Sequence, residues 1–426
     1  RENKKIKKEL REDFDSALKK YRKHFYIPED TIYLDGNSLG LLSKEAEKSV
    51  ISILEEWKKL GIKGWLDGKD PWFYLGEKLG GEAAELVGAK EEEVILTGST
   101  TVNIHQLIST FYEPQGTKTK IIADELNFPS DIYALKSQIK LKGLNPEKHL
   151  VLASGEEGNL NEEEIVNLMD EDTALVFLPS VLYTSGQLLD MEYLTKKAHE
   201  KNILIGFDCA HSVGVIPHKF DEWGVDFATW CGYKYLNGGP GCTAFIYVNK
   251  KHFDKEPGLA GWWGYKKDEQ FDMKQEFKSE KNTGGLQIST PNILGSAALK
   301  GSLELINDAG IDSIREKSLK LTNYLMYLID EELSEEPYLF SYGNPKEDEQ
   351  RGGHVALKRE EEAFRINEAL KSKGIVPDFR PPNIIRIAPI PLYNTYSEVW
   401  KVVQKIKEII DQEEYKEFSK KRDAVS

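Results

Sequence analysis

ILIGFDCAHSVG, at residues 203–214, and WCGYKYLNGGPG, at residues 230–241, are the segments that say most about the fold. The first reads as an apolar β-strand that ends at Asp208, and the second places Lys234 between two tyrosines, 26 positions after that acid. Many enzymes hold pyridoxal phosphate (PLP) in this way: the Lys forms a Schiff base and the acid keeps the ring nitrogen protonated. We therefore expect Lys234 and Asp208 to face one cofactor.

Apolar runs alternate with amphipathic stretches between about residue 90 and residue 250. This alternation is typical of a parallel sheet with crossover helices, so we predict an α/β fold with a mainly parallel, seven-stranded sheet between helices. Helices are expected at Asn161 to Asp170 and at Met191 to Lys201, where charges match the helix dipole. The strand candidates are Val94 to Thr97, Lys120 to Ala123, His149 to Ala153, Ala174 to Pro179, Ile203 to Asp208, Asp226 to Cys231 and Thr243 to Val248.

The chain has 426 residues, more than one hydrophobic core usually supports. We predict a large PLP-binding domain at 46–305, a smaller α/β domain at 306–426, and an N-terminal segment, 1–45, that packs with the small domain. One long helix is expected from Ile293 to Ile306. The small domain is expected to contain helices near 312–333 and 359–373 and strands near 354–357 and 384–388.

The net charge of −14 disfavours nucleic acid or an anionic membrane as the main partner. The first thirty residues have neither the composition of a transit peptide nor the apolar run of a signal peptide, and no apolar run approaches the length of a bilayer span. Cys209, Cys231 and Cys242 lack the paired spacing of a zinc site, so we expect reduced buried thiols and no metal. These features favour a cytoplasmic enzyme that acts on a small molecule.

Asp208 lies at the carboxyl end of its strand, where ligands bind in open α/β sheets. Taken alone it is equally explained as a helix N-cap. His211, three residues later, is expected to face the cofactor, although an isolated His is usually structural. Tyr233 is a candidate for a phosphate contact or a proton transfer, whereas Tyr235 is more simply explained by core packing.

Two further loops are candidates for the same site. The segment LTGSTTVNIHQL, residues 96–107, places Thr100 and Thr101 at a helix start, which suits a phosphate. The segment FPSD, Phe128 to Asp131, follows another strand and offers a ring-stacking Phe and an acid. Each pattern is also typical of an ordinary helix start. The prediction depends on their meeting at one edge of the sheet.

These residues are part of a wider resemblance to the kynureninase family, PLP enzymes of fold type I in the aspartate aminotransferase superfamily. The shared motifs run through nearly the whole chain: YLDGNSLGLL at 33–42, TVNIHQL at 101–107, FPSDIYALKSQ at 128–138, GFDCAHSVG at 206–214, WGVDFATWCGYKYLN at 223–237, GWWG at 261–264 and IIRIAPIPLYNTYSEV at 384–399. The resemblance implies hydrolytic cleavage of the Cβ–Cγ bond of L-kynurenine to L-alanine and anthranilate. It also implies tryptophan catabolism or pyridine nucleotide (NAD) biosynthesis, and a homodimer with shared active sites.

The resemblance also implies roles for individual residues. Lys234, Tyr233 and Asp208 would be catalytic, and Arg386 would hold the substrate α-carboxylate with Asn37 and Trp65 nearby. Arg suits that role because its planar guanidinium binds a carboxylate through two hydrogen bonds. The cofactor would contact Thr100, Thr101, Phe128, Pro129, Ser130, Asp131, Asp208, His211, Tyr233 and Lys234, together with Trp262 and Thr290 from the partner subunit.

Family members that prefer 3-hydroxykynurenine have His and Asn where this chain has Trp65 and Thr290, so we expect that substrate to be the poorer one. Pro179 stands where many relatives have Ser or Thr, so a cofactor contact is either missing or supplied by Ser180. Gly232, directly before Tyr233, stands where relatives often have Ser. Two alternatives stay open: a cysteine desulfurase or related class V aminotransferase, which needs a reactive Cys on a mobile loop, and a nonenzymatic protein that kept the fold.

Overall fold

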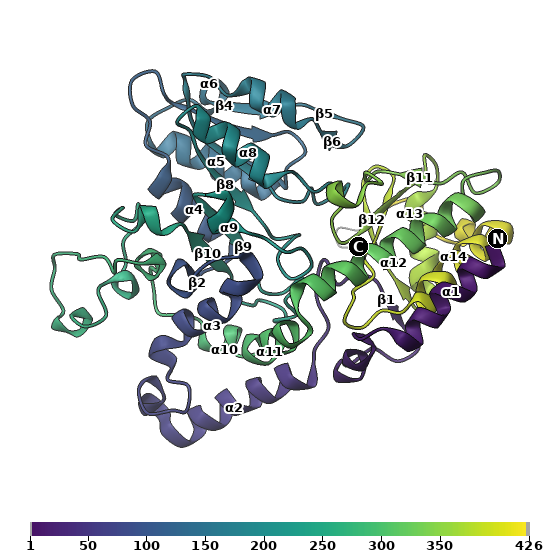
Figure 1. The fold of residues 1–426 in the computed structure, drawn as a ribbon, viewed down its shortest axis with the longest axis horizontal. Helices are drawn as coiled ribbons and strands as arrows, with labels where there is room; N and C mark the ends of the chain where they lie inside the picture. Colours follow the sequence, from purple (N-terminus) through teal and green to yellow (C-terminus); the bar gives the residue numbers. More distant parts are fainter. Residues whose placement is uncertain (1, 423–426) are drawn as a thin grey trace.

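The computed structural model describes residues 2–422 of the chain. Figure 1 shows two lobes side by side. One is built around a seven-stranded sheet, and the other contains the C-terminal third of the chain together with the N-terminal helix.

The central sheet confirms all seven predicted strands, with ends that differ by one or two residues. Its strand order is β2-β10-β9-β8-β7-β3-β4. All neighbouring pairs are parallel except those that β10 makes with β2 and β9. The strands are β2 (Val94–Leu96), β3 (Lys120–Asp124), β4 (Leu150–Ala153), β7 (Thr173–Pro179), β8 (Leu204–Asp208), β9 (Phe227–Trp230) and β10 (Phe245–Val248).

Both faces of this sheet are apolar because helices cover both faces. On β7, Val176 and Leu178 join one buried cluster while Leu175 and Phe177 join another, as the alternation of side chains along a strand requires. The second cluster is completed by α4 (Thr100–Phe111) and α5 (Pro129–Leu141). The first is completed by α3 (Leu75–Ala84), α7 (Glu162–Leu168), α8 (Met191–Glu200), α9 (Phe220–Trp223) and α11 (Leu299–Ala309).

The prediction of one long helix from Ile293 to Ile306 was wrong. The structure has two helices, α10 (Ile293–Ser296) and α11, because the hydrogen-bond ladder breaks at Ser296. The Ser296 hydroxyl donates to the carbonyl of Asn292 at 2.7 Å, and its oxygen also lies 2.8 Å from the Thr243 hydroxyl. The Ser296 side chain therefore bonds the Asn292 carbonyl, a group that a continuous helix bonds through backbone N–H.

The small lobe is an antiparallel sheet of order β11-β12-β15-β14 packed against three helices. The strands expected near 354–357 and 384–388 and the helices near 312–333 and 359–373 are all present. The strands are β11 (Ser341–Tyr342), β12 (Val355–Lys358), β14 (Asp378–Arg380) and β15 (Ile384–Ile387). The helices are α12 (Ile311–Glu332), α13 (Ala363–Ser372) and α14 (Tyr396–Asp411).

The N-terminal segment contacts both lobes. Helix α1 (Glu2–Asp15) lies against α14, and β1 (Ile32–Tyr33) pairs in parallel with β13 (Ile375–Val376) of the small lobe. Tyr21 and Phe25, however, belong to the core of the large lobe. The domain boundaries at 45 and 305 stay a prediction.

The remaining α-helices and strands are the 17-residue α2 (Lys44–Leu60) and three short elements, α6 (Pro146–His149), β5 (Gly155–Glu156) and β6 (Asn159–Leu160). Within residues 2–422 there is no helix with the length and apolar character that a bilayer crossing requires. The same residues contain no cluster of three His, Cys, Asp or Glu side chains arranged to hold a metal ion.

Candidate active site

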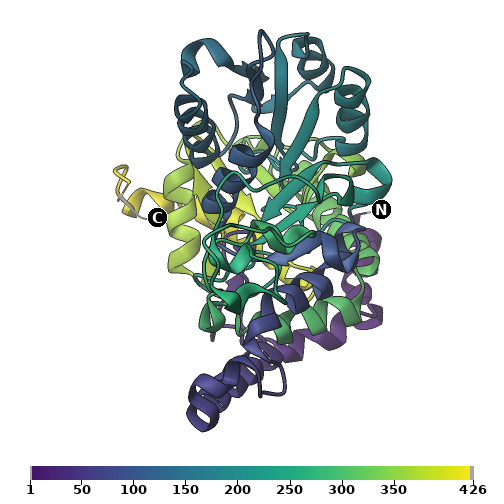
Figure 2. The same ribbon diagram turned by 90° about the vertical axis from the view of Figure 1, so that its left-hand side faces the viewer.

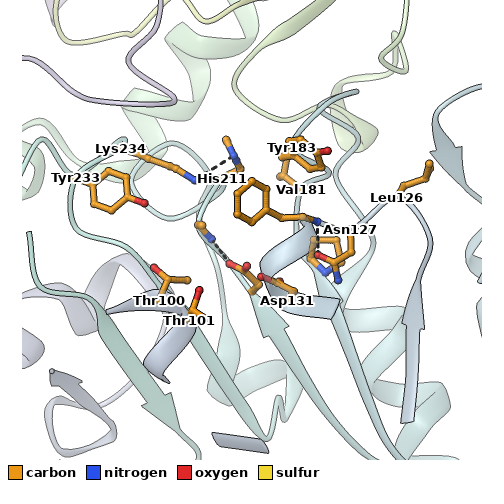
Figure 3. Close-up of a pocket in the computed structure, with 14 residues that line it drawn as sticks. Thr100, Thr101, Leu126, Asn127, Asp131, Val181, Tyr183, His211, Tyr233 and Lys234 are labelled. Atoms are coloured by element: carbon orange, nitrogen blue, oxygen red, sulfur yellow. Dashed lines mark hydrogen bonds between the residues drawn. The ribbon is translucent and has the colours of Figure 1, made fainter. Parts of the chain in front are cut away.

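A pocket opens at the carboxyl edge of the central sheet (Figure 3). The strand order reverses between β3 and β7, which is where open α/β sheets bind their ligands. The loops after β2, β3, β7, β8 and β9 all reach this point. The residues that line the pocket are Thr100, Thr101, Leu126, Asn127, Phe128, Asp131, Pro179, Val181, Tyr183, Asp208, Ala210, His211, Tyr233 and Lys234.

Lys234 extends into the pocket from the loop after β9, and its Nζ lies 3.3 Å from Nε2 of His211 (Figure 3). Burial, and then the positive charge of Lys234, lower the pKa of His211 well below its ordinary value. The imidazole is therefore neutral at pH 7 and can accept a hydrogen bond from the lysine. Tyr233 lies beside them, and burial raises its pKa to about 12, so it keeps its proton.

Two acids meet at the base of the pocket. Asp208 ends β8, where its Oδ1 accepts a hydrogen bond from the backbone of Ala210 at 2.9 Å. Asp131, in the first turn of α5, is 1 % exposed, and burial followed by the charge of Asp208 raises its pKa well above the ordinary value. Behind them Asp124 is fully buried, with a pKa raised to about 7 by burial. This end of the pocket can bind a protonated ring nitrogen.

Another part of the pocket, where α4 begins, can bind an anion. Thr100 and Thr101 are the first residues of that helix, whose free backbone N–H groups and dipole favour an anion. Thr101 Oγ1 is 2.7 Å from Oγ of Ser130, which joins the starts of α4 and α5. The hydroxyl of Thr100 is buried without a partner among the described residues.

These observations fit PLP. Four buried polar atoms of pocket-lining residues have no hydrogen-bond partner within the described chain: Thr100 Oγ1, Asn127 Nδ2, Asp131 Oδ2 and His211 Nδ1. Buried polar groups are rarely left unpaired, so these atoms indicate that a polar ligand completes the site. An amine, an acidic end and an anion-binding helix start match the aldehyde, the ring nitrogen and the phosphate of that cofactor.

Phe128 is half-exposed beside the pocket, and its ring meets that of Tyr183 edge-on with centroids 5.3 Å apart. It is free to stack on a bound ring. Sequence reasoning missed Tyr183, Asn127, Leu126, Val181 and Ala210 as lining residues. Two of them carried a signal: Asn127 directly precedes FPSD, and Ala210 lies in GFDCAHSVG. Within FPSD, Pro129 and Ser130 do not line the pocket.

Arg386 is 1 % exposed, so it is not a surface residue of its strand. It does not line the pocket itself, but its Nη1 donates to the carbonyl of Tyr183 at 2.7 Å, and Tyr183 does line it. Asn37 is also fully buried, with neither polar side-chain atom bonded within the described chain. Gly40, close by in the same motif, donates its backbone N–H to the carbonyl of Tyr233 at 2.8 Å.

Trp65, Trp262 and Thr290 lie outside the chain's own pocket. Trp65 packs in an aromatic cluster, with ring centroids 5.6 Å from Trp72 and 5.5 Å from Trp263. Trp262 is 41 % exposed and Thr290 is exposed. A single chain therefore does not bring these three residues to the pocket.

The structure bears on both departures from the family pattern. Pro179 lines the pocket, whereas the Ser180 hydroxyl is buried and bonded to that of Ser212 at 2.6 Å. At Gly232 a Cβ atom would lie 2.6 Å from Sγ of Cys242, which leaves no room for a Ser.

The three cysteines are buried and free, as expected: Cys209 and Cys231 directly follow β8 and β9, and Cys242 lies three residues before β10. Burial raises the pKa of all three thiols, to about 12 for Cys209. A reactive thiolate of the kind that a desulfurase uses requires the opposite environment.

Known proteins resemble the chain over almost its entire length. It is 58 % identical over 415 residues to a kynureninase of Geobacillus thermodenitrificans, with 97 % of this chain and 96 % of the relative covered. A kynureninase of Bacillus cereus is 57 % identical with the same coverage. A sequence model of the kynureninase C-terminal domain matches residues 314–406.

Solved structures with the same fold are more distant in sequence. An apo cysteine desulfurase from Thermococcus onnurineus superposes with a TM-score of 0.77 at 20 % identity, covering 92 % of this chain and 98 % of its own. A C-DES mutant with glycine covalently linked to its PLP cofactor gives 0.77 at 17 % identity, covering 90 % and 98 %. These matches confirm the predicted fold type I architecture.

Proposed function

The chain belongs to the kynureninase family, and from this premise we propose that the pocket around Lys234 is where it hydrolyses L-kynurenine to L-alanine and anthranilate. It is a PLP-dependent enzyme that hydrolyses a carbon–carbon bond in a ketonic substance. Cysteine desulfurases share its fold only as distant relatives. The observation that carries the assignment of the site is a lysine amine in a pocket that also holds paired acids and a helix start.

When bound, PLP supplies an electron sink for a carbanion at the substrate α carbon. The chain's own residues orient it. Asp208 and Asp131, whose pKa is raised by burial and by the charge of Asp208, would hold the ring nitrogen, and Thr100, Thr101 and the start of α4 would hold the phosphate. Phe128 would stack on the ring.

Hydrolysis of the Cβ–Cγ bond adds water at the γ ketone carbon and delivers a proton to the β carbon, which becomes the methyl group of alanine. Lys234 Nζ removes the proton from the α carbon. Tyr233 is the proton donor or relay, because its raised pKa keeps the hydroxyl protonated at neutral pH. The neutral His211 holds the lysine amine by a hydrogen bond when the amine is free.

Arg386 binds the α-carboxylate, with Asn37 nearby, and so aligns the bond to be broken. Trp65 and Thr290 face the aromatic end of the substrate and favour unsubstituted L-kynurenine. The ratio of kcat/KM for L-kynurenine to that for 3-hydroxykynurenine measures this preference. A ratio below one would show that the two residues do not set the specificity in this way.

The active unit is a homodimer in which Trp262 and Thr290 complete the partner's site. Both residues are exposed and lie outside the pocket of their own chain. They belong to a region rich in exposed apolar side chains, which we call the apolar face. Its members are Ile51, Leu54, Trp57, Ile62, Leu66, Trp262, Phe271 and Met273, each at least 41 % exposed.

The apolar face is formed by α2, by the turn that follows it, and by the loop around residues 260–275, which lie on the same side of the molecule in Figure 2. Trp65 joins the two parts through its contact with Trp263. Exposed apolar patches of this kind mark interfaces, and a second copy is the occupant that brings Trp262 and Thr290 to a cofactor. The free, buried thiols suit the cytoplasm, where tryptophan breakdown or NAD synthesis would use the products.

Lys234→Ala tests the assignment directly. The purified variant should lose the near-visible absorbance of lysine-bound cofactor and should form no anthranilate, which is followed by its fluorescence. Lys317→Ala, which removes another buried lysine from the small lobe, should keep both signals. A Lys234→Ala enzyme with wild-type turnover would refute the assignment.

A further inference from the structure

The guanidinium of Arg386 is held by three parts of the chain. Asp378, on the neighbouring strand β14, accepts hydrogen bonds from Nε at 2.6 Å and from Nη2 at 2.5 Å. Ser38, in the N-terminal segment, accepts from Nη2 at 3.0 Å, and the carbonyl of Tyr183, in the large lobe, accepts from Nη1 at 2.7 Å. Arg386 therefore joins both lobes at the edge of the pocket.

These contacts distinguish the two edges at which a guanidinium can bind a carboxylate. A guanidinium has five N–H groups, and four are used here. The carboxylate of Asp378 occupies the inner edge, formed by Nε and Nη2, in bidentate fashion. The outer edge, formed by Nη1 and Nη2, holds only a hydroxyl and a backbone carbonyl. It is also the edge next to Tyr183, which lines the pocket.

Asp378 is itself firmly placed. It is the register partner of Arg386 in the antiparallel pair β14–β15, so their side chains lie on one face of the sheet. Asp378 is 8 % exposed, and its Oδ2 also accepts from Nη2 of Arg380 at 2.9 Å and from the hydroxyl of Ser38 at 3.3 Å. Burial raises its pKa, but the hydrogen bonds and charge of Arg386 outweigh burial and lower the pKa overall. The group is an anion at neutral pH.

We propose that Asp378 is a positioning residue for substrate binding: it holds the inner edge of Arg386 so that the outer edge receives the substrate α-carboxylate, which displaces the Ser38 hydroxyl. The inference deepens the proposed function and rests on it for the role of Arg386. In this proposal the small-lobe sheet sets the orientation of Arg386, the group that would select an α-amino acid.

The opposite arrangement, in which Asp378 occupies the substrate's place and must leave, disagrees with the geometry. If Asp378 moved away, its buried carboxylate would lose both hydrogen bonds to Arg386, although strand pairing keeps the two residues next to each other. Breaking a buried charge pair is costly because the remaining charge stays without a partner. The two arrangements predict opposite effects of neutralising Asp378, since removing a competitor would tighten the binding of a carboxylate.

The test uses the holoenzyme and two simple ligands. L-Alanine carries the α-carboxylate, L-alaninamide lacks it, and the binding of each is followed by the change in cofactor absorbance. In Asp378→Asn the Kd for L-alanine should rise about 10- to 100-fold, as expected for loss of one hydrogen bond to a charged group, and the Kd for L-alaninamide should stay within twofold. An unchanged or lower Kd for L-alanine would overturn the proposal.

Asp348→Asn is the matched control, because Asp348 bonds the fully buried Arg351 at 3.0 Å elsewhere in the small lobe. It should leave both Kd values unchanged. Where Asp378→Asn fails to fold, Asp378→Glu is used instead, because it keeps the charge but shifts the guanidinium. It should raise the Kd for L-alanine at least fivefold and leave the Kd for L-alaninamide unchanged. An equal rise in both Kd values would refute a positioning role. Failure of the proposed function gives a separate result, the absence of anthranilate formation by the wild-type enzyme.

Discussion

Trp57→Asp should separate the proposed dimer and abolish activity together with it. Trp57 lies near the end of α2 and is 55 % exposed. Since a Trp side chain buries up to about 250 Å², roughly 140 Å² of Trp57 remains for a partner to cover. At about 25 cal/mol per Å², this area corresponds to about 3 kcal/mol per subunit and about 7 kcal/mol for the two copies of a symmetric interface.

The dissociation constant of the dimer should therefore rise at least about 10⁵-fold, since each 1.4 kcal/mol is a factor of ten and the new carboxylates add desolvation costs. Mass photometry or sedimentation at a series of protein concentrations gives this constant. Anthranilate formation in the same samples should fall as the dimer fraction falls, because monomers lack the partner's Trp262 and Thr290.

Leu141→Asp is the matched control. Leu141 ends α5 and is 75 % exposed, but it lies outside the apolar face. Its variant should keep the wild-type dissociation constant and turnover. A Trp57→Asp protein that stays dimeric at nanomolar concentration would refute the placement of the interface, and a fully active monomer would refute shared active sites.

Three further results are expected. Gly232→Ala should lower the free energy of unfolding by about 1–3 kcal/mol and speed the loss of PLP on dialysis, because the new Cβ would lie 2.6 Å from Sγ of Cys242 in the loop that carries the catalytic lysine. Asp226→Asn should lower the free energy of unfolding in urea by about 2 kcal/mol at pH 7. Hydrogen bonds from His199 and His252 outweigh burial and hold the pKa of Asp226 below its ordinary value, so the wild type should lose its extra stability over the variant as the pH falls below about 4. Burial and a hydrogen bond with Asp221 raise the pKa of Glu93 to about 7, so Glu93 stabilises the fold below pH 4.5 and this contribution is lost as the pH rises through 7. Glu93→Gln should remove this pH dependence of the melting temperature. A variant with the wild-type pH profile would refute the role of Glu93.

The central sheet could be predicted from sequence because strands buried on both faces are continuous apolar runs. Ala174 to Pro179 is such a run, and the structure places it in β7. The break at Ser296 could not be predicted, because it depends on a hydroxyl bonding to Thr243, which is distant in sequence.

The cofactor side of the site could also be predicted, since Asp208, Phe128 and Thr100 each follow a strand and parallel strands end at one edge. Tyr183 follows β7 in the same way, but it lies four residues beyond the strand in a turn without a recognisable motif. Trp65 was expected beside the substrate, but in the single chain it packs against Trp72 and Trp263 outside the pocket.

The substrate side depends on contacts that no local pattern encodes. Asp378 and Arg386 are eight residues apart and become partners only when β14 pairs with β15 in one register. Ser38 and Tyr183 then approach the same guanidinium from segments more than 140 residues apart. Because strand pairing orients the Asp378–Arg386 pair, a carboxylate at the outer edge would bind to a group already aligned by the small lobe. Displacing the Ser38 hydroxyl would change one of the two contacts that Arg386 makes outside that lobe. Recognition of the amino-acid end of the substrate would thereby be coupled to the relative position of the lobes, while the proposed chemistry would stay with Lys234 on the large one.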